Sequence, residues 1–172
     1  MSHTFVHLHL HTEYSLSDGL VRIDPLMEAT AAAAMPAVAL TDQSNLFALV
    51  RFYKAASKQG IKPLIGVDAW VEGEDPAERD RLVLLCQNET GYLNLTRLIS
   101  QSYLEGQVKD TPILRRAWLA AAAEGLLALS GGREGGIGKA LLAGRRANAA
   151  TQLQAWLEIF PGRFYLELQR TG

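Results

Sequence analysis

Residues 6–12 read Val-His-Leu-His-Leu-His-Thr, and a polar loop that contains Ser15 follows them. In an extended chain successive side chains point to opposite faces, so the histidines at positions 7, 9 and 11 would share one face. Imidazoles two residues apart on a strand can converge on one ion, and neutral imidazole is a common ligand for zinc and related metals. A surface strand with solvated histidines is the alternative. All four histidines of the chain lie within its first eleven residues, and this clustering favours a metal site.

The composition is that of an ordinary globular protein. The chain has 172 residues, of which 48% are hydrophobic and 20% charged, enough for a single domain with a hydrophobic core. A net charge of -1 provides no overall basic field for nucleic acid, so contact with DNA would need a local patch or another part of a larger assembly. The single cysteine, Cys86, excludes an internal disulfide and fits a reducing compartment. Without an apolar run of roughly 18 residues or a signal peptide, we expect a cytoplasmic protein.

Apolar segments typical of strands alternate with helical segments along the chain, which predicts an α/β fold with a parallel sheet and right-handed crossovers. Loops are expected at residues 73–81 and 106–112. The expected strands are residues 5–9, 37–41, 62–71, 82–86, 126–129 and 164–169, and the expected helices are residues 24–34, 46–59, 92–104, 115–124, 139–142 and 148–160.

Residues with known preferences for helix ends mark several of these boundaries. Asp24, followed by Pro25, is predicted to cap the first helix, Asn45 the second and Thr90 the third. Gly60 is predicted to follow the C-terminus of the second helix, where a left-handed backbone favours glycine.

Polar side chains follow most of the expected strands directly. Because the carboxyl ends of parallel strands meet at one edge of a sheet or one rim of a barrel, these side chains are expected to form a common site. The polar residues in question are His9, His11, Asp42, Asp68, Asn88, Ser130, Gln169 and Arg170.

Five segments taken together resemble the PHP (polymerase and histidinol phosphatase) superfamily. They are residues 7–19, 39–47, 61–68, 88–95 and 129–133, which include the sequences Leu-Thr-Asp-Gln-Ser-Asn-Leu-Phe and Leu-Ser-Gly-Gly-Arg. The resemblance implies a distorted (β/α)7 TIM-like barrel, present here as an incomplete barrel that stops before closure within residues 1–172. It also implies an ancestral trinuclear metal site at the strand ends, which in active relatives activates water for phosphoester hydrolysis.

The resemblance assigns ligand positions to residues of this chain. His9, His11, Asp18 and Asp68 match metal ligands, the last being one methylene shorter than the usual glutamate, and a residual site would hold Zn, Mn or Mg. Three further ligand positions are replaced, by Gln43, Arg81 and Gly132, and the final ligand pair would lie beyond Gly172. The metal site is therefore expected to be vestigial or weak. His7 and Asp42 are expected to support the ligands without binding metal, although Asp42 could instead cap a helix.

More narrowly, the chain resembles the degenerate PHP domains at the N-terminus of bacterial DNA polymerase III alpha subunits that use a separate proofreading exonuclease (epsilon) subunit. This implies a non-catalytic scaffold and docking platform, within a longer chain that is a DNA-directed DNA polymerase and contacts DNA. The isolated fragment is expected to self-associate. We expect the Arg81 guanidinium to replace a metal's charge and to hold Asp18 or Asp68. The alternative function is a metal-dependent phosphoesterase or pyrophosphatase with a partial metal site.

Overall fold

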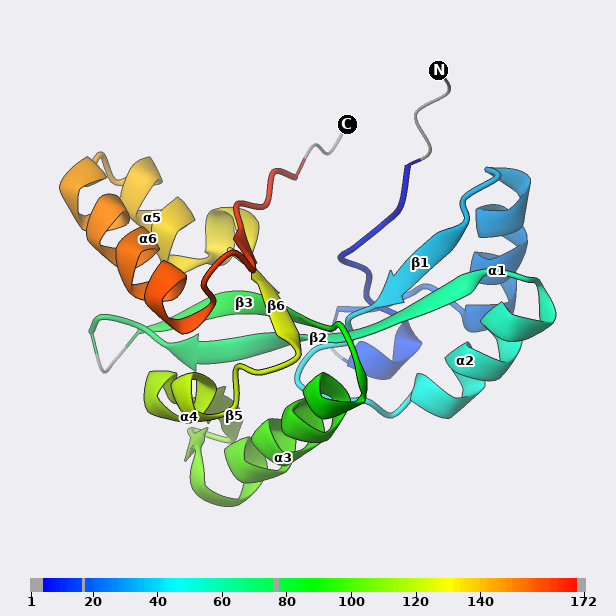
Figure 1. The fold of residues 1–172 in the computed structure, drawn as a ribbon, viewed down its shortest axis with the longest axis horizontal. Helices are drawn as coiled ribbons and strands as arrows, with labels where there is room; N and C mark the ends of the chain where they lie inside the picture. The colour runs from blue at the N-terminus through cyan, green and yellow to red at the C-terminus, as the bar shows by residue number, and fades with distance from the viewer. Residues whose placement is uncertain (1–4, 17, 76–77, 170–172) are drawn as a thin grey trace. The chain divides into compact units, whose positions relative to one another are not determined.

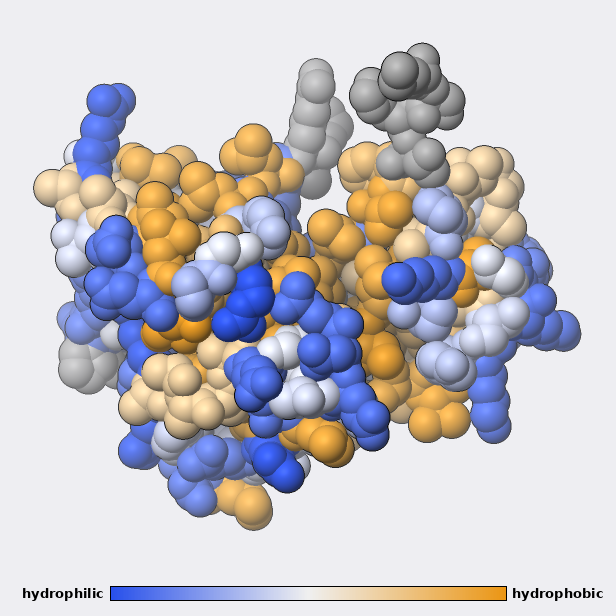
Figure 2. Space-filling model, viewed as in Figure 1, coloured by the Kyte–Doolittle hydropathy of each residue, from blue (hydrophilic) through white to orange (hydrophobic). Residues whose placement is uncertain are grey.

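The computed structural model describes residues 5–16, 18–75 and 78–169 (Figure 1). The chain forms two compact units, Met1–Val67 and Asp68–Gly172, and each is described by itself. Strand β2 (Lys62–Glu72) contributes residues to both. Hydrophobic residues reach the surface in both units (Figure 2). Within the described residues, no helix has the length and apolar character required to cross a membrane.

The first unit packs two helices beside a parallel strand pair. Its regular elements are the short 3-10 helix η1 (Glu13–Ser15), helix α1 (Ile23–Ala32), strand β1 (Ala37–Leu40), helix α2 (Leu49–Lys58) and the first part of β2. β1 runs parallel to β2, with Ala37 opposite Lys62 and Leu40 opposite Ile65. The core is formed by fully buried side chains of α1, β1 and α2, namely Ile23, Met27, Val38, Leu40, Phe52 and Ala56.

The expected strand at residues 5–9 is wrong, because this segment lies beside β1 without forming a regular ladder. The carbonyl of His7 accepts from the amide of Ala39 at 2.9 Å, and the carbonyl of Leu10 accepts from the amide of Thr41 at 3.0 Å. Between these two hydrogen bonds the chain advances three residues from His7 to Leu10 but only two from Ala39 to Thr41. The first segment therefore contains one extra residue, as in a β-bulge. The amide of Leu10 donates to the Thr41 hydroxyl at 2.7 Å, which takes it out of any backbone ladder.

The second unit is built on a mixed sheet, so the predicted parallel sheet is present only in part. β2–β5 and β6–β7 are parallel pairs, whereas β3–β6 and β4–β5 are antiparallel. The strands lie in the order β4-β5-β2-β3-β6-β7. In chain order, the strands after β2 are β3 (Arg79–Cys86), β4 (Gln107–Val108), β5 (Thr111–Leu114), β6 (Leu126–Leu129) and β7 (Phe164–Tyr165).

The β4–β5 hairpin occupies most of residues 106–112, which were expected to form a loop. Lys109 and Asp110 form its two-residue turn, and both have positive φ angles, 50° and 62°. Such left-handed pairs match the twist of a tight hairpin, and a connection this short can join only antiparallel strands. At the other edge, β7 is shorter than expected because the amide of Glu167 donates to the Ser130 hydroxyl and not to a strand partner.

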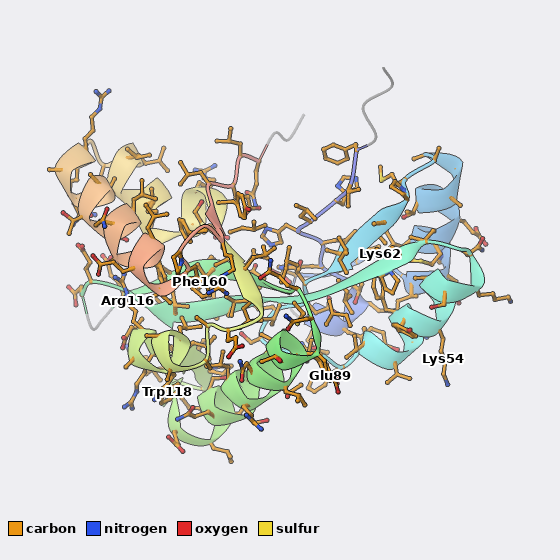
Figure 3. All side chains as sticks on the ribbon, in the orientation of Figure 1. Lys54, Lys62, Glu89, Arg116, Trp118 and Phe160 are labelled. Atoms are coloured by element: carbon orange, nitrogen blue, oxygen red, sulfur yellow. The ribbon has the colours of Figure 1, made fainter. Side chains whose placement is uncertain are left out.

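Helices pack against this sheet, and aromatic rings fill part of the space between them. Trp156 of α6 stacks on Phe164 of β7 at a ring separation of 6.1 Å, and Phe160 (labelled in Figure 3) is fully buried. The helices are α3 (Glu89–Glu105), α4 (Arg116–Ala121), α5 (Gly136–Leu142) and α6 (Arg146–Ile159), with the 3-10 turn η2 (Gly132–Glu134) before α5.

The structure corrects the predicted caps and confirms one helix stop. Asn88, and not Thr90, caps α3, since its Oδ1 accepts from the amide of Gly91 at 3.0 Å. α1 begins at Ile23, so Asp24 lies inside its first turn. Asn45 caps the turn that precedes α2, which begins three residues later than expected. Gly60 follows α2 with a φ of +69°, as predicted.

Candidate functional site

In the first unit, the structure brings two of the three alternating histidines together. The rings of His9 and His11 are 5.2 Å apart at an angle of 60°, and both residues are half-buried. His7 is exposed, and its ring centre lies 4.9 Å from that of Phe5, with the two rings nearly perpendicular. The extra residue opposite β1 breaks the simple alternation that would have placed all three imidazoles on one face.

Asp18 lies beside this histidine pair. Its Oδ1 is 3.0 Å from Nδ1 of His11, and the carboxylate is about one-third exposed. A carboxylate next to one ring nitrogen fixes the ring orientation and favours a proton on that nitrogen. The other nitrogen of His11 is then the one that can act as a Lewis base.

A buried carboxylate organises the loop that carries His11. Asp42, which is 1% exposed, accepts from the Thr12 amide at 2.6 Å, from the Thr12 hydroxyl at 2.9 Å and from the Ser15 hydroxyl at 2.9 Å. Hydrogen bonds to a charged acceptor are stronger than neutral ones, and their loss inside a protein is costly. Asp42 therefore does not cap α2 but holds residues 12–15 against the end of β1.

Two neighbours of Asp42 complete this arrangement. The amide of Gln43 donates to the Ser15 hydroxyl at 3.0 Å, and the side-chain amide of Asn45 donates to the carbonyl of Tyr14 at 3.0 Å. Sequence reasoning missed this function of Thr12, Ser15 and Asn45. A run of polar residues directly after a buried strand was the available signal, but it does not reveal which loop those residues bind.

In the second unit, Asp68 is engaged by a guanidinium. Nη1 of Arg81 lies 2.8 Å from Oδ2 of Asp68, and the two side chains are 8% and 2% exposed. The Arg81 guanidinium also sits 4.0 Å from the ring centre of Trp70, and its Nε is 3.8 Å from a carboxylate oxygen of Glu134. Of the two carboxylates that Arg81 was expected to hold, Asp68 is thus paired with it. Trp70 and Glu134 were not anticipated, because nothing in the sequence places them beside Arg81.

The backbone conformation at Gly132 is unfavourable for a residue with a metal-binding side chain. Its φ of +57° is left-handed, a conformation that side-chain-bearing residues rarely adopt. A Cβ added there would meet the carboxamide of Gln169 at 3.1 Å. A histidine or cysteine at this position would therefore need both a strained backbone and a displaced Gln169.

Cys86, at the end of β3, has a thiol whose burial opposes ionisation. Burial raises its pKa to about 12, which keeps the thiol protonated at neutral pH. The thiolate is the form that attacks electrophiles and binds metals, so burial disfavours both reactions at Cys86.

These donor sets do not fit a trinuclear metal centre. His9 and His11 offer two imidazoles, and the Asp18 carboxylate is paired with Nδ1 of His11, so the first unit supplies too few donors to hold three ions. Oδ2 of Asp68 is paired with the Arg81 guanidinium, and Gly132 has no side chain. The amide of Gln43 is a poor ligand for zinc or manganese.

The comparisons with known proteins agree with the sequence motifs. The family model of PHP domain sequences matches residues 7–171 of this chain. The chain belongs to the PHP domain family. This confirms the resemblance on which the ligand assignments depend.

Similar PHP sequences occur in bacterial DNA polymerases. The chain is 54% identical over 173 residues to DNA polymerase III subunit alpha of Pseudomonas aeruginosa, and the match covers 100% of this chain. It is 46% identical over 169 residues to the same subunit of Vibrio cholerae and of Escherichia coli K12, where 98% of the chain is covered. The chain matches the PHP portion of these subunits and spans 15% of their length.

Among solved structures, the PHP chain resembles a proposed metal-dependent phosphoesterase from Bifidobacterium adolescentis. The TM-score is 0.58 at 13% sequence identity, over 96% of this chain and 77% of the other. At this identity the similarity shows the α/β fold alone.

Proposed function

We propose that the chain is the PHP part of a replicative DNA polymerase alpha subunit and acts there as a scaffold. It supports the polymerase core and docks a proofreading exonuclease (epsilon) subunit, while DNA contact and nucleotidyl transfer belong to the rest of the polypeptide. In this proposal the two units form part of a distorted (β/α)7 barrel, and the protein works in the bacterial cytoplasm. Identity of about half over the whole chain to such subunits supports the assignment.

The Arg81–Asp68 pair is the observation that carries the non-catalytic part of the proposal. A guanidinium 2.8 Å from a buried carboxylate provides the positive charge that a bound cation would otherwise supply. With two further ligand positions held by Gln43 and Gly132, the former metal site keeps charge balance without metal. The domain can then retain its fold while losing hydrolysis.

Metal content and hydrolysis of a generic phosphodiester test this proposal directly. We expect the purified chain to contain no stoichiometric Zn, Mn or Mg by elemental analysis and to lack phosphodiesterase and pyrophosphatase activity with each metal added. Stoichiometric metal together with metal-dependent turnover would refute the scaffold role. Docking is tested separately, by co-purification of the exonuclease subunit with the longer polymerase chain.

The second candidate is a phosphoesterase or pyrophosphatase with a partial metal site. The pairing of His9 with His11 and the contact between His11 and Asp18 favour it, since they keep three potential ligands in one unit. If this candidate is correct, metal-dependent hydrolysis will be present in the wild-type chain and lost in the His9→Ala/His11→Ala variant. The same variant should leave a pure scaffold unchanged in any assay of hydrolysis.

A further inference from the structure

Helix α2 presents two different faces. Phe52 and Ala56 are fully buried in the core of the first unit. Val50 and Tyr53, three residues apart and so neighbours on the helix surface, are 66% and 53% exposed, and Phe47 in the preceding turn is 66% exposed. Large apolar side chains gathered on one exposed face are typical of interaction sites, and aromatic residues are enriched in them.

The segment of the chain that contains α2 carries charges of one sign. Residues 43–67 contain Arg51, Lys54, Lys58 and Lys62 and no acidic residue. Arg51 is used within the unit, since it donates to Asp24 of α1 at 3.1 Å. Lys54 and Lys58 share the exposed side of α2 by their spacing, and Figure 3 shows Lys54 projecting away from the helix.

We propose that the face formed by Phe47, Val50, Tyr53, Lys54 and Lys58 is a docking surface for an acidic, apolar peptide segment of a partner protein. The three apolar side chains provide anchors for apolar groups of the peptide, and the two ammonium groups flank them with a charge that an acidic peptide complements. The two lysine ammonium groups of this face are too few to hold the phosphates of a nucleic acid. Helix α2 has only ten residues, and its two exposed ammonium groups are too few for stable binding to a lipid surface.

This inference rests on the proposed docking role and makes it more specific. Its test measures peptide binding by the 172-residue chain. The docking surface can therefore be refuted while the polymerase assignment stands, and the polymerase assignment can be refuted while peptide binding is observed.

A random peptide library displayed on phage, selected on the immobilised chain, provides an unbiased probe. We expect the enriched peptides to combine acidic with apolar residues and to bind in fluorescence anisotropy with an affinity that falls as salt is added. The Val50→Ser/Tyr53→Ser and Lys54→Glu/Lys58→Glu variants should each weaken binding about tenfold or more. Leu104→Ser, at an 83% exposed apolar position on α3, is the matched control and should bind as the wild type does.

Circular dichroism melts show whether the variants stay folded, as expected for substitutions at exposed positions. The inference is overturned if no peptides are enriched, if the enriched peptides are neutral or basic, or if the α2 variants bind them unchanged. Binding of single-stranded DNA or of phosphatidylserine vesicles that the α2 substitutions abolish, with no peptide enriched, would assign this face to nucleic acid or lipid instead.

Discussion

At the scale of single residues, Arg81 is important to the second unit because it pairs with the buried Asp68 carboxylate. Replacing it with alanine leaves the Asp68 carboxylate buried without this counter-charge, which typically costs about 3 kcal/mol or more. We therefore expect Arg81→Ala to lower the free energy of unfolding by that amount in urea titrations. Arg79, on the same strand and 4.7 Å from the Trp70 ring but exposed, is the matched control, and Arg79→Ala should cost less than about 1 kcal/mol. Equal effects of the two substitutions would contradict this account of Arg81.

Asp42 has the corresponding importance in the first unit. Asp42→Asn keeps the shape of the side chain but removes the charge that attracts the Thr12 and Ser15 donors, and it introduces two N–H groups beside them. We expect a loss of about 1–3 kcal/mol and faster hydrogen exchange of the amides in residues 12–15. Asp24→Asn, which changes an exposed carboxylate of the same unit, should leave that exchange unchanged. Unchanged exchange in Asp42→Asn would show that the loop is held by other contacts.

At the scale of elements, the N-terminus of α3 distinguishes the observed cap from the predicted one. Asn88→Ala removes the acceptor of the Gly91 amide and should cost about 1 kcal/mol of stability. Thr90, which was predicted to be the cap, lies inside the first turn of α3. Thr90→Ala should therefore leave the stability nearly unchanged. The reverse order of the two melting temperatures would show that the helix begins at the predicted residue.

Strand β3 ends at Cys86, and the raised pKa of this thiol predicts a dependence of stability on pH. Unfolding returns the pKa from about 12 to its ordinary value near 9, so between these values the folded state holds a proton that the unfolded state has released. The stabilising contribution is therefore complete below pH 9 and declines as the pH rises towards 12. The free energy of unfolding of the wild type minus that of Cys86→Ala should decrease between these pH values, and a constant difference would contradict the burial of the thiol.

These elements also show what the sequence could determine. Strand β6 and the stop at Gly60 were predicted correctly, because a short apolar run and a left-handed glycine are local signals. The β4–β5 hairpin was missed because its turn residues, Lys109 and Asp110, are not the asparagine-glycine pair that usually marks such turns. The irregular segment at residues 5–10 depends on its register with β1, which hydrophobic alternation cannot reveal.

The same distinction holds for the candidate site. The family motifs identified His9, His11, Asp18, Asp68 and the replaced position at Arg81, and their ligand roles remain predictions. The contacts that hold these side chains were beyond the sequence, because Asp42 with Thr12 and Arg81 with Trp70 are brought together only by strand pairing and loop closure.

At the scale of the whole molecule, the last strand of the sheet leaves apolar groups uncovered. β7 lies at one end of the strand order, and its residue Tyr165 is 54% exposed, while Leu166 and Leu168 just after it are 58% and 94% exposed. A strand at a sheet edge offers unpaired backbone groups, and exposed apolar side chains beside it favour pairing with another chain. We therefore expect the 172-residue chain to self-associate through this edge.

Light scattering coupled to size-exclusion chromatography over a range of protein concentrations measures this association. The apparent mass should rise with concentration above the 18.8 kDa of one chain, and Leu166→Lys/Leu168→Lys should lower it towards that value, since charged side chains on an edge oppose strand pairing. Leu141→Lys, at a 53% exposed position on α5, is the control and should associate as the wild type does. A chain that stays monomeric at every concentration would show that the edge beside β7 does not recruit a second chain, and equal effects of the edge and control substitutions would place the contact elsewhere.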